Sequence, residues 1–191
     1  MIKKSSYKHL LKITLTSLLL TMLFNTNASA QFYAIKTDAL GLLTGSVNAD
    51  ASMALNEHYT IHLHGQYNPW TYSGNKKFKN ITVLPGLRYW RGETYGYGWF
   101  AGVNAIYSHY NVGGFFGGKN RYQGDAYGAG VSIGYSIPIR KRLNIEFEIG
   151  GGIVYTQYGK YKCTTCGTKI SDENKFLVVP SKAAVSIVYL F

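Results

Sequence analysis

The most chemically distinctive residues are two cysteines, Cys163 and Cys166, which are separated by two threonines. An exported chain meets oxidising machinery, so we expect a local disulfide between them. The closed loop would be very short, so this bond would stiffen the segment more than it stabilises the fold. The pair could instead be half of a zinc knuckle, but structural zinc takes four ligands, and His109 or another molecule would have to contribute. Thioredoxin-type chemistry is weaker because its βαβ context is missing.

Acyl-transfer chemistry would need a nucleophile, a base and an orienting acid close together. Known barrel enzymes that modify lipid A carry a His-x-Ser pair and a carboxylate at the outer rim of the barrel. Here His109 is followed two positions later by Asn111, and the His62–His64 pair falls on a polar row instead. The sequence therefore predicts no enzyme, no catalytic residue, no bound metal and no cofactor.

Charged residues of both signs fall on the polar faces of alternating segments. Burying either sign alone would cost several kcal/mol per ion, so we expect mutual neutralisation, with Lys36 and Lys182 close to Glu146 or Glu148. A proton or ion pathway is the functional alternative. The expected charge network comprises Lys36, Asp38, Arg88, Glu146, Glu148 and Lys182, with Asp50, His62 and His64 on the same polar rows.

The elements that must position these charges are strands, because apolar residues alternate with polar or glycine residues in 126–137 and in 143–157. A period of two is typical of strands and cannot arise from a helix. The same pattern predicts eight strands, at 32–40, 46–56, 58–68, 80–91, 98–110, 125–138, 142–157 and 178–191.

The connections between these strands alternate in length. Tight turns are expected around 56–57, 91–97 and 138–141, whereas 68–79, 111–124 and 158–177 are long and 41–45 is modest. An even strand count with all tight turns on one side is typical of small outer-membrane barrels. An eight-stranded barrel is about filled by its own side chains, so a wide pore is not expected.

The first thirty residues have the pattern of a signal peptide. Four lysines precede a short apolar run at 13–24, and Ala28-Ser29-Ala30 is a small-residue cleavage site. The apolar run is shorter than the roughly 20 residues of a membrane span. We therefore expect cleavage after Ala30, which divides the chain into a signal peptide, 1–30, and one barrel domain, 31–191.

The composition is compatible with an exported protein that crosses a membrane with β-strands. Four of the 20 Lys and Arg and none of the 9 Asp and Glu lie in 1–30, so 31–191 carries a formal charge of +7. An exported basic chain meets anionic glycolipid rather than nucleic acid. The mean hydropathy of −0.08 is compatible with a barrel in which every second residue faces lipid.

Aromatic residues bracket the apolar rows, as expected for rings that prefer the two lipid–water interfaces. The row Ala183, Val185, Ile187, Tyr189 and Phe191 alternates up to a terminal aromatic residue, which resembles the signal that barrel-assembly machinery recognises. One girdle is expected at Tyr33, Tyr59, Tyr89, Trp99, Tyr135, Tyr189 and Phe191, and the other at Tyr67, Trp70, Tyr72, Tyr107, Tyr127, Tyr155 and Tyr158.

Several stretches resemble an uncharacterised family of small Bacteroidetes-type outer-membrane barrels. The resemblance covers nearly all of 31–191 and implies fold and location but no activity; it also points to a fimbria-like surface partner. Gly86 departs from the glutamate typical of that position. The matching stretches are 67–70 with 75–77, 87–90, 110–114, 121–124, 126–130 and the loop at 163–167.

Taken together, the sequence predicts an all-β protein, an eight-stranded antiparallel up-and-down transmembrane barrel in the cell outer membrane. We expect a monomer with a structural or surface-interaction role, whose basic outer loops contact lipopolysaccharide, a host surface or a protein partner. A narrow channel or transporter is the alternative. A soluble lipocalin-like binder is a third possibility, which the lipid-facing rows argue against.

Overall fold

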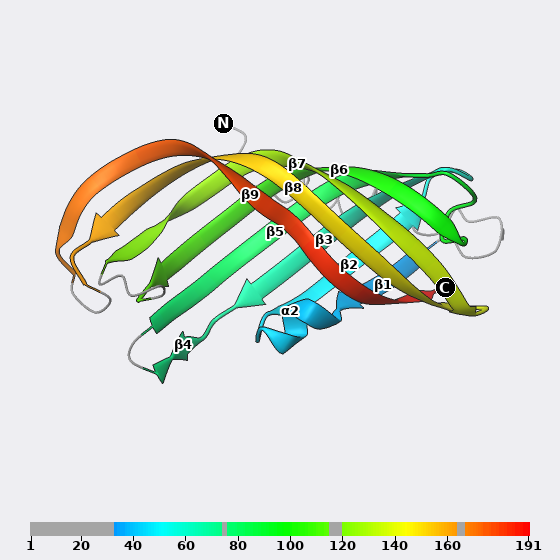
Figure 1. Cartoon of the computed structure of the whole chain (residues 1–191), viewed down its shortest axis with the longest axis horizontal. Helices are drawn as coiled ribbons and strands as arrows, with labels where there is room; N and C mark the ends of the chain where they lie inside the picture. Colours follow the sequence, from blue (N-terminus) through cyan, green and yellow to red (C-terminus); the bar gives the residue numbers. More distant parts are fainter. Residues whose placement is uncertain (1–32, 74–75, 115–119, 164–166) are drawn as a thin grey trace, which may run out of the picture. The chain divides into compact units, whose positions relative to one another are not determined.

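Strands form most of the part of the chain that the computed structural model describes, residues 33–73, 76–114, 120–163 and 167–191 (Figure 1). The one α-helix of these described residues, α2 (Ala39–Leu43), is short and follows the first strand. The strands are β1 (Tyr33–Asp38), β2 (Val47–Ala54), β3 (Tyr59–Asn68), β4 (Thr71–Tyr72), β5 (Lys76–Trp90), β6 (Gly98–Gly113), β7 (Arg121–Arg140), β8 (Leu143–Tyr161) and β9 (Lys169–Leu190).

These strands form one antiparallel sheet in which strands pair with their neighbours along the chain, except that β3 pairs with β5 instead of the short β4, and β9 pairs back onto β1. The pairing of β3 with β5 completes a ring of eight up-and-down strands, and the short β4 pairs with the end of β5 outside that ring. The all-β architecture with eight antiparallel strands therefore agrees with the sequence prediction. No helix in the described residues is long and apolar enough to cross a membrane.

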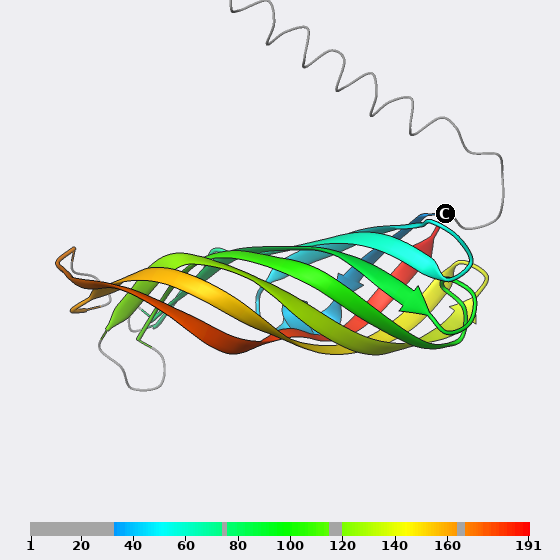
Figure 2. The same ribbon diagram turned by 90° about the horizontal axis from the view of Figure 1, so that it is seen from above.

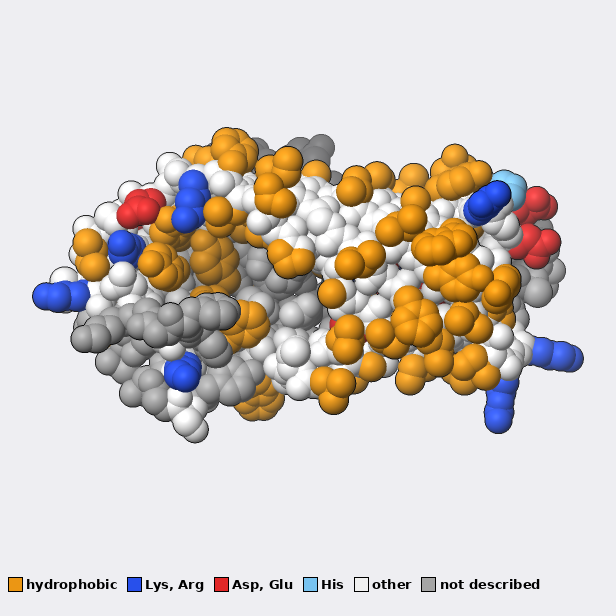
Figure 3. All heavy atoms as spheres, viewed as in Figure 1, with side chains coloured by type: hydrophobic (Ala, Val, Ile, Leu, Met, Phe, Trp, Pro, Cys, Tyr) orange, Lys and Arg blue, Asp and Glu red, His pale blue; other side chains and the backbone are white. Residues whose placement is uncertain are grey.

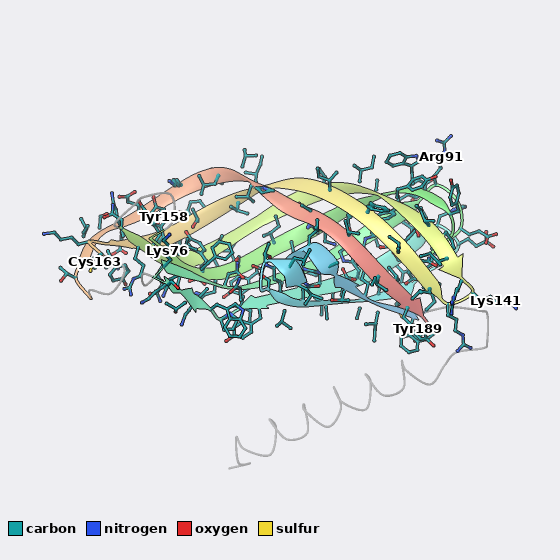
Figure 4. The ribbon with its side chains drawn as sticks, turned by 60° about the horizontal axis from the view of Figure 1, so that its bottom comes forward. Lys76, Arg91, Lys141, Tyr158, Cys163 and Tyr189 are labelled. Atoms are coloured by element: carbon teal, nitrogen blue, oxygen red, sulfur yellow. The ribbon has the colours of Figure 1, made fainter. Side chains whose placement is uncertain are left out.

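The ring has two distinct ends. We call one the turn end, where the connections 55–58, 91–97 and 141–142 are short, and the other the hairpin end, where β3, β6 and β8 finish. Figure 4 shows Arg91, Lys141 and Tyr189 at the turn end and Lys76, Tyr158 and Cys163 at the opposite end. β1 begins and β9 ends at the turn end, so successive connections of this up-and-down ring alternate between the two ends. The short connections therefore all lie at the turn end.

Alternation along each strand separates an inner from an outer face. On β8, Glu146 and Glu148 are buried inside the ring, whereas Ile149 between β7 and β9 is 67% exposed. Hydrophobic side chains are spread over the outer surface, while many of the charged side chains visible in Figure 3 gather toward its two ends. The outer surface between the two ends is therefore largely apolar, whereas ionisable side chains such as Glu146 and Glu148 lie inside the ring.

Two apolar clusters lie inside the ring, one on each side of the buried charges. At the turn end, the indole of Trp90 packs on the rings of Tyr95 and Phe100, with centroid distances of 5.6 and 4.7 Å. Toward the hairpin end, a second cluster comprises Leu84, Ile106, Ala126 and Val154. The interior is thus layered as apolar plug, charges and apolar floor.

Inward glycines let neighbouring strands pack closely around this filled interior. A Cβ atom on Gly134 would lie 2.2 Å from Cζ of Phe100, and one on Gly128 would lie 2.1 Å from the carbonyl oxygen of Ile153. Both distances are far inside van der Waals contact. Glycine is therefore required at position 134 by the neighbouring Phe100 ring and at position 128 by the close backbone of β8.

The strands reach further toward the hairpin end than the sequence predicted. The segment 158–177, expected as a long loop, is mostly strand, because β8 continues to Tyr161 and β9 already begins at Lys169. In Figures 1 and 2 this β8–β9 hairpin projects beyond the other strands. Its backbone pairs across the hairpin even where the side chains lack an apolar alternation, which is why the sequence pattern did not reveal it.

A β-bulge divides β9 into two segments. Lys182 pairs with Gly150 and Pro180 with Gly151, so Ser181 is the extra residue. Below the bulge the even-numbered residues of β9 point inward, whereas above it Val179 and Leu177 take the inward positions opposite Gly152 and Val154. One inserted residue therefore reverses which side chains face the interior.

Candidate functional site

The most concentrated group of ionisable side chains lies inside the ring near mid-height. Lys36 on β1 donates from Nζ to Glu146 Oε2 at 3.0 Å and to Glu148 Oε2 at 3.2 Å, both on β8. Because β1 and β8 flank β9, these bonds cross over an intervening strand. They tie together strands that share no backbone hydrogen bonds.

Arginine and a second lysine extend this group across the ring. Arg88 on β5 donates from Nη2 to Asp50 Oδ2 on β2 and to Glu148 Oε2, at 3.2 Å each. Lys182 on β9 donates to both oxygens of Glu148, at 3.3 and 3.2 Å. Glu148 is thus the centre of the cluster, contacted by all three cations and by the hydroxyl of Ser132 at 2.8 Å.

The charges in this cluster balance. Lys36, Arg88 and Lys182 face Asp50, Glu146 and Glu148, and each of the six is at most 8% exposed. Two histidines complete the layer: Nδ1 of His62 lies 3.3 Å, and Nδ1 of His64 3.8 Å, from Asp50 Oδ2. Because breaking a buried pair leaves an uncompensated charge, such a cluster fixes strand positions strongly.

Asp38 lies outside this cluster, so its sequence assignment to the charge network was wrong. Its carboxylate instead caps α2, accepting from the backbone N–H of Leu40 and Gly41 at 3.0 and 2.8 Å. The same carboxylate accepts from the backbone N–H of Val185 on β9 at 3.0 Å. The strand ends at Asp38 and a helical turn begins, so the alternation that predicted an inward side chain no longer applies.

The turn end of the ring is closed by a tyrosine from the β5–β6 connection. The hydroxyl of Tyr95 lies 3.0 Å from Ser52 Oγ, and its carbonyl accepts from Asn144 Nδ2 at 2.6 Å. Burial raises the pKa of Tyr95 to about 12. The residue therefore stays neutral at physiological pH and acts as a plug beneath the charges.

A histidine–carboxylate pair that sequence reasoning missed lies on the outer face. His109 Nδ1 is 2.9 Å from Asp125 Oδ1, and the Tyr107 hydroxyl donates to the same oxygen at 3.3 Å. From the sequence, His109 was considered with Asn111 and as a zinc ligand for the cysteines, but not with Asp125, which is its register partner on β7. In the described residues, no three or more His, Cys, Asp or Glu side chains are arranged to hold a metal.

The remaining predicted site residues lie near the two ends. Tyr189 and Phe191 stack at the turn end with ring centroids 5.1 Å apart, and the backbone N–H of Phe191 donates to the carbonyl of Tyr33 at 2.9 Å. Cys163 follows β8 and is disulfide-bonded. Cys166 lies outside the described residues, so its predicted pairing with Cys163 stays a prediction.

Aromatic side chains form a continuous row across four strands near the hairpin end. Tyr107 is opposite Tyr127, Tyr127 is opposite Tyr155, and Tyr155 is opposite Phe176. The ring centroids are 5.2 Å apart for Tyr107 and Tyr127 and 5.1 Å apart for Tyr155 and Phe176. Tyr158, predicted for this outer girdle, points inward instead and is 6% exposed.

A second row of aromatic side chains lies near the turn end, on β3, β5, β6 and β7. Trp99 and Tyr135 are 5.0 Å apart between ring centroids, and Tyr59 and Tyr89 are 5.3 Å apart. The eight-residue spacing recurs on four strands: Tyr59 and Tyr67 on β3, Trp99 and Tyr107 on β6, Tyr127 and Tyr135 on β7, Phe147 and Tyr155 on β8.

The outward positions between the two rows carry no charged side chain. We call this zone the apolar belt. On each of the four strands, three outward residues lie between the two aromatic residues, and every one is apolar or glycine. They are Ile61, Leu63, Gly65, Ala101, Val103, Ala105, Ala129, Val131, Ile133, Ile149, Gly151 and Ile153.

Fold and site together define a closed antiparallel ring with an electrically balanced interior and an apolar belt between two aromatic rows. The family described as "Protein of unknown function (DUF3575)" matches residues 15–191. The chain belongs to this family. Neither a search of curated proteins nor a search of solved structures gave a match.

Proposed function

We propose that the protein is a small β-barrel of the cell outer membrane, exported by a signal peptide at 1–30, with a structural or surface-interaction role. The apolar belt between the two aromatic rows carries this proposal. A soluble ring has no reason to expose branched aliphatic residues such as Val131, which is 63% exposed, all around its circumference. Lipid-facing strands require such a surface.

The height of the belt supports membrane insertion. Eight residues at about 3.3 Å rise span about 26 Å along a strand. A tilt of roughly 40° shortens this to about 20 Å across the membrane, near the apolar band of about 25 Å in outer-membrane barrels. The rows would then lie at the two interfaces, where amphipathic rings are most stable.

The interior favours a structural role over a channel. Trp90, Tyr95 and Phe100 fill the ring at the turn end, and the balanced ionic cluster fills it above them. A conducting path would have to pass both layers. Planar-bilayer recording of the purified protein should therefore show no conductance steps, and discrete steps would establish the channel instead.

Membrane insertion can be tested with one matched pair of substitutions on β7. Val131 lies midway between Tyr127 and Tyr135, so Val131→Arg should destabilise the barrel in lipid vesicles by about 2–4 kcal/mol. Ile139→Arg, also outward but beyond Tyr135, should cost about 0–1 kcal/mol. Equal effects of the two variants, or a wild-type protein recovered as a detergent-free soluble monomer, would refute the proposal.

The surface role can be tested by shortening the β8–β9 hairpin without disturbing its register. Gln157 pairs with Asn174, so replacing 157–174 by Asn-Gly leaves Thr156 paired with Lys175. The shortened protein should still insert and show heat-modifiable migration, but should lose adhesion or capture of its surface partner. Unchanged adhesion would remove this hairpin from the interaction; lipopolysaccharide binding would then be measured on Lys76→Gln and Lys79→Gln variants.

A further inference from the structure

The ring interior opens into a cavity at the hairpin end, which we call the vestibule. Its volume is about 650 Å³, and it is lined by inward residues of β5 to β9. This volume falls in the range of small-molecule sites, about 300–1,000 Å³. The cavity lies on the opposite side of the ionic cluster from the Trp90 plug.

The floor of the vestibule is apolar. Leu84, Ile106, Ala126 and Val154 form it and are buried from solvent by one another. Val179, inward on β9 above the bulge, packs against the same cluster. A hydrocarbon or aromatic body placed here would leave water without burying any charge, which is the main favourable term in binding.

The rim of the vestibule is polar and carries an excess of positive charge. Lys160 and Lys175 line it together with Glu173. Oxygens of Glu173 already accept hydrogen bonds from the hydroxyls of Tyr158 at 2.8 Å and Ser171 at 2.9 Å. Lys175 Nζ lies 5.4 Å from the Tyr158 ring centroid, and both lysines interact electrostatically with Glu173, which leaves one positive charge in excess at the rim.

One buried hydroxyl marks the inner wall. Ser181, the extra residue of the β9 bulge, lines the vestibule, and its Oγ is buried without a hydrogen-bond partner among the described residues. A buried hydroxyl without a partner is costly. A bound molecule with a polar atom beside the floor would satisfy it.

We infer that the vestibule binds a small anionic amphiphile. Its apolar body would rest on Leu84, Ile106 and Val154, and its carboxylate or phosphate would meet Lys160 and Lys175 at the rim. The inference goes beyond the structural role proposed above, although its test rests on the proposed membrane insertion. Recovery of the protein in nanodiscs reports that insertion separately from binding of the probe.

The primary test uses a fluorescent fatty acid, 11-(dansylamino)undecanoic acid, with the full-length protein in phosphatidylcholine nanodiscs. Saturable binding above that of empty nanodiscs is expected. Ala126→Phe, which fills the floor, should weaken binding at least tenfold, whereas Ala129→Phe, three residues along β7 on the outer face, should leave it unchanged. Absence of saturable binding, or equal losses in both variants, would overturn the inference.

The charge requirement is tested separately, with variants that leave the floor intact. The double variant Lys160→Gln/Lys175→Gln should weaken binding of the acid about tenfold and should not affect binding of the methyl ester of the same probe. Lys141→Gln, at the turn end of the ring, is the matched control. If binding of the ester and of the acid falls equally in the double variant, the lysines do not recognise the anion and the inference fails. This outcome can be measured even where Ala126→Phe does not fold.

The source of the bound anion is distinguished by lipid composition. In nanodiscs that contain phosphatidylglycerol, a membrane lipid as natural occupant should compete with the probe in the wild type but not change the residual binding of the lysine double variant. Equal probe affinity in both lipid compositions would assign the site to a free amphiphile from the exterior. Either result supports an anionic amphiphile in the vestibule.

Discussion

The two halves of β9 place the same residue types in opposite environments. Between Ser186 and Leu190, β9 pairs with β1 on one side and β8 on the other. Between Lys169 and Ala184, its ladder runs to β8 alone among the described residues, because β1 ends at Asp38. Lys182 and Lys175 both take inward positions, yet Lys182 is buried and Lys175 is exposed.

This comparison teaches that enclosure, rather than residue type, determines where charge is buried. Lys182 also lies on the stretch of β9 that pairs with β8 alone, but its side chain reaches the ionic cluster, where three carboxylates neutralise three cations. Lys175 lies further toward the hairpin end, at the exposed rim of the vestibule, where water can solvate its ammonium group. The end of β1 at Asp38 therefore separates the part of β9 that is paired on both edges from the part that pairs with β8 alone.

The largest predicted effect concerns Glu148, at the centre of the buried ionic cluster. Glu148→Gln leaves three cations facing two carboxylates and should lower the free energy of unfolding by about 3–5 kcal/mol. Urea unfolding in lipid vesicles, followed by tryptophan fluorescence, measures it. Glu173→Gln, the inward carboxylate of the open half, should leave the midpoint unchanged.

A charge-balanced double variant sharpens this result. Lys182→Met combined with Glu148→Gln removes one charge of each sign, so it should recover part of the stability lost by Glu148→Gln alone. A double-mutant cycle isolates the pairwise energy. Additive losses would mean that the cluster acts through packing instead of charge pairing.

The next effect concerns close packing in the enclosed half. Gly134→Ala places a methyl group 2.2 Å from the Phe100 ring and should cost about 1–3 kcal/mol through overpacking. Gly151→Ala is the control, since its Cβ would come no closer than 3.9 Å to a neighbouring atom. Thermal or urea unfolding distinguishes them, and equal losses would contradict the packing argument.

A smaller effect is expected at the boundary between the halves. Asp38→Ala removes the cap of α2 and the acceptor for the Val185 N–H, so it should cost about 0.5–2 kcal/mol. The exposed Asp172→Ala variant should behave as wild type. If Asp38→Ala were equally silent, its carboxylate would not help to hold β9 at the place where β1 ends.

The smallest effect is local and leaves global stability unchanged. In Ser186–Leu190 both edges of β9 are paired, so successive backbone amides should resist hydrogen exchange. In Lys169–Lys175 only the edge toward β8 is paired, so fast and slow amides should alternate along the strand. Amide-resolved NMR exchange in detergent micelles measures the pattern, and uniform protection would show that another strand covers this edge.

The sequence predicted the ring well because a period of two is visible wherever one face is apolar. The inward positions of Lys36, Arg88 and Glu148 follow from parity alone, and their mutual contacts follow from the cost of burying unpaired charge. The same parity, extended from Glu146 and Glu148, would have placed Tyr158 inside. Tyr158 was predicted for the outer girdle because it is aromatic, although strand parity places it inside the ring, and that prediction was wrong.

Other features could not be obtained from periodicity. The hairpin segment Lys169–Lys175 carries polar residues on both faces, so its strand structure depends on backbone pairing with β8 rather than on any side-chain pattern. Asp38 was misplaced because a helix N-cap interrupts the alternation, although aspartate is a preferred cap and could have signalled this. Which part of β9 has only β8 as a neighbour depends on where β1 ends in the folded ring, and the residue pattern does not determine this.

The bulge at Ser181 makes β9 two sequences with opposite phase. An insertion or deletion on its hairpin side would exchange Phe176 and Val178 with Lys175 and Leu177 between exterior and vestibule, yet the pairing of Lys182 with Glu148 would keep its frame. The rim of the vestibule can therefore vary by whole-residue steps while the ionic layer beneath stays in place. Changes in the residues at the opening of the vestibule therefore need not disturb the ionic cluster that stabilises the ring.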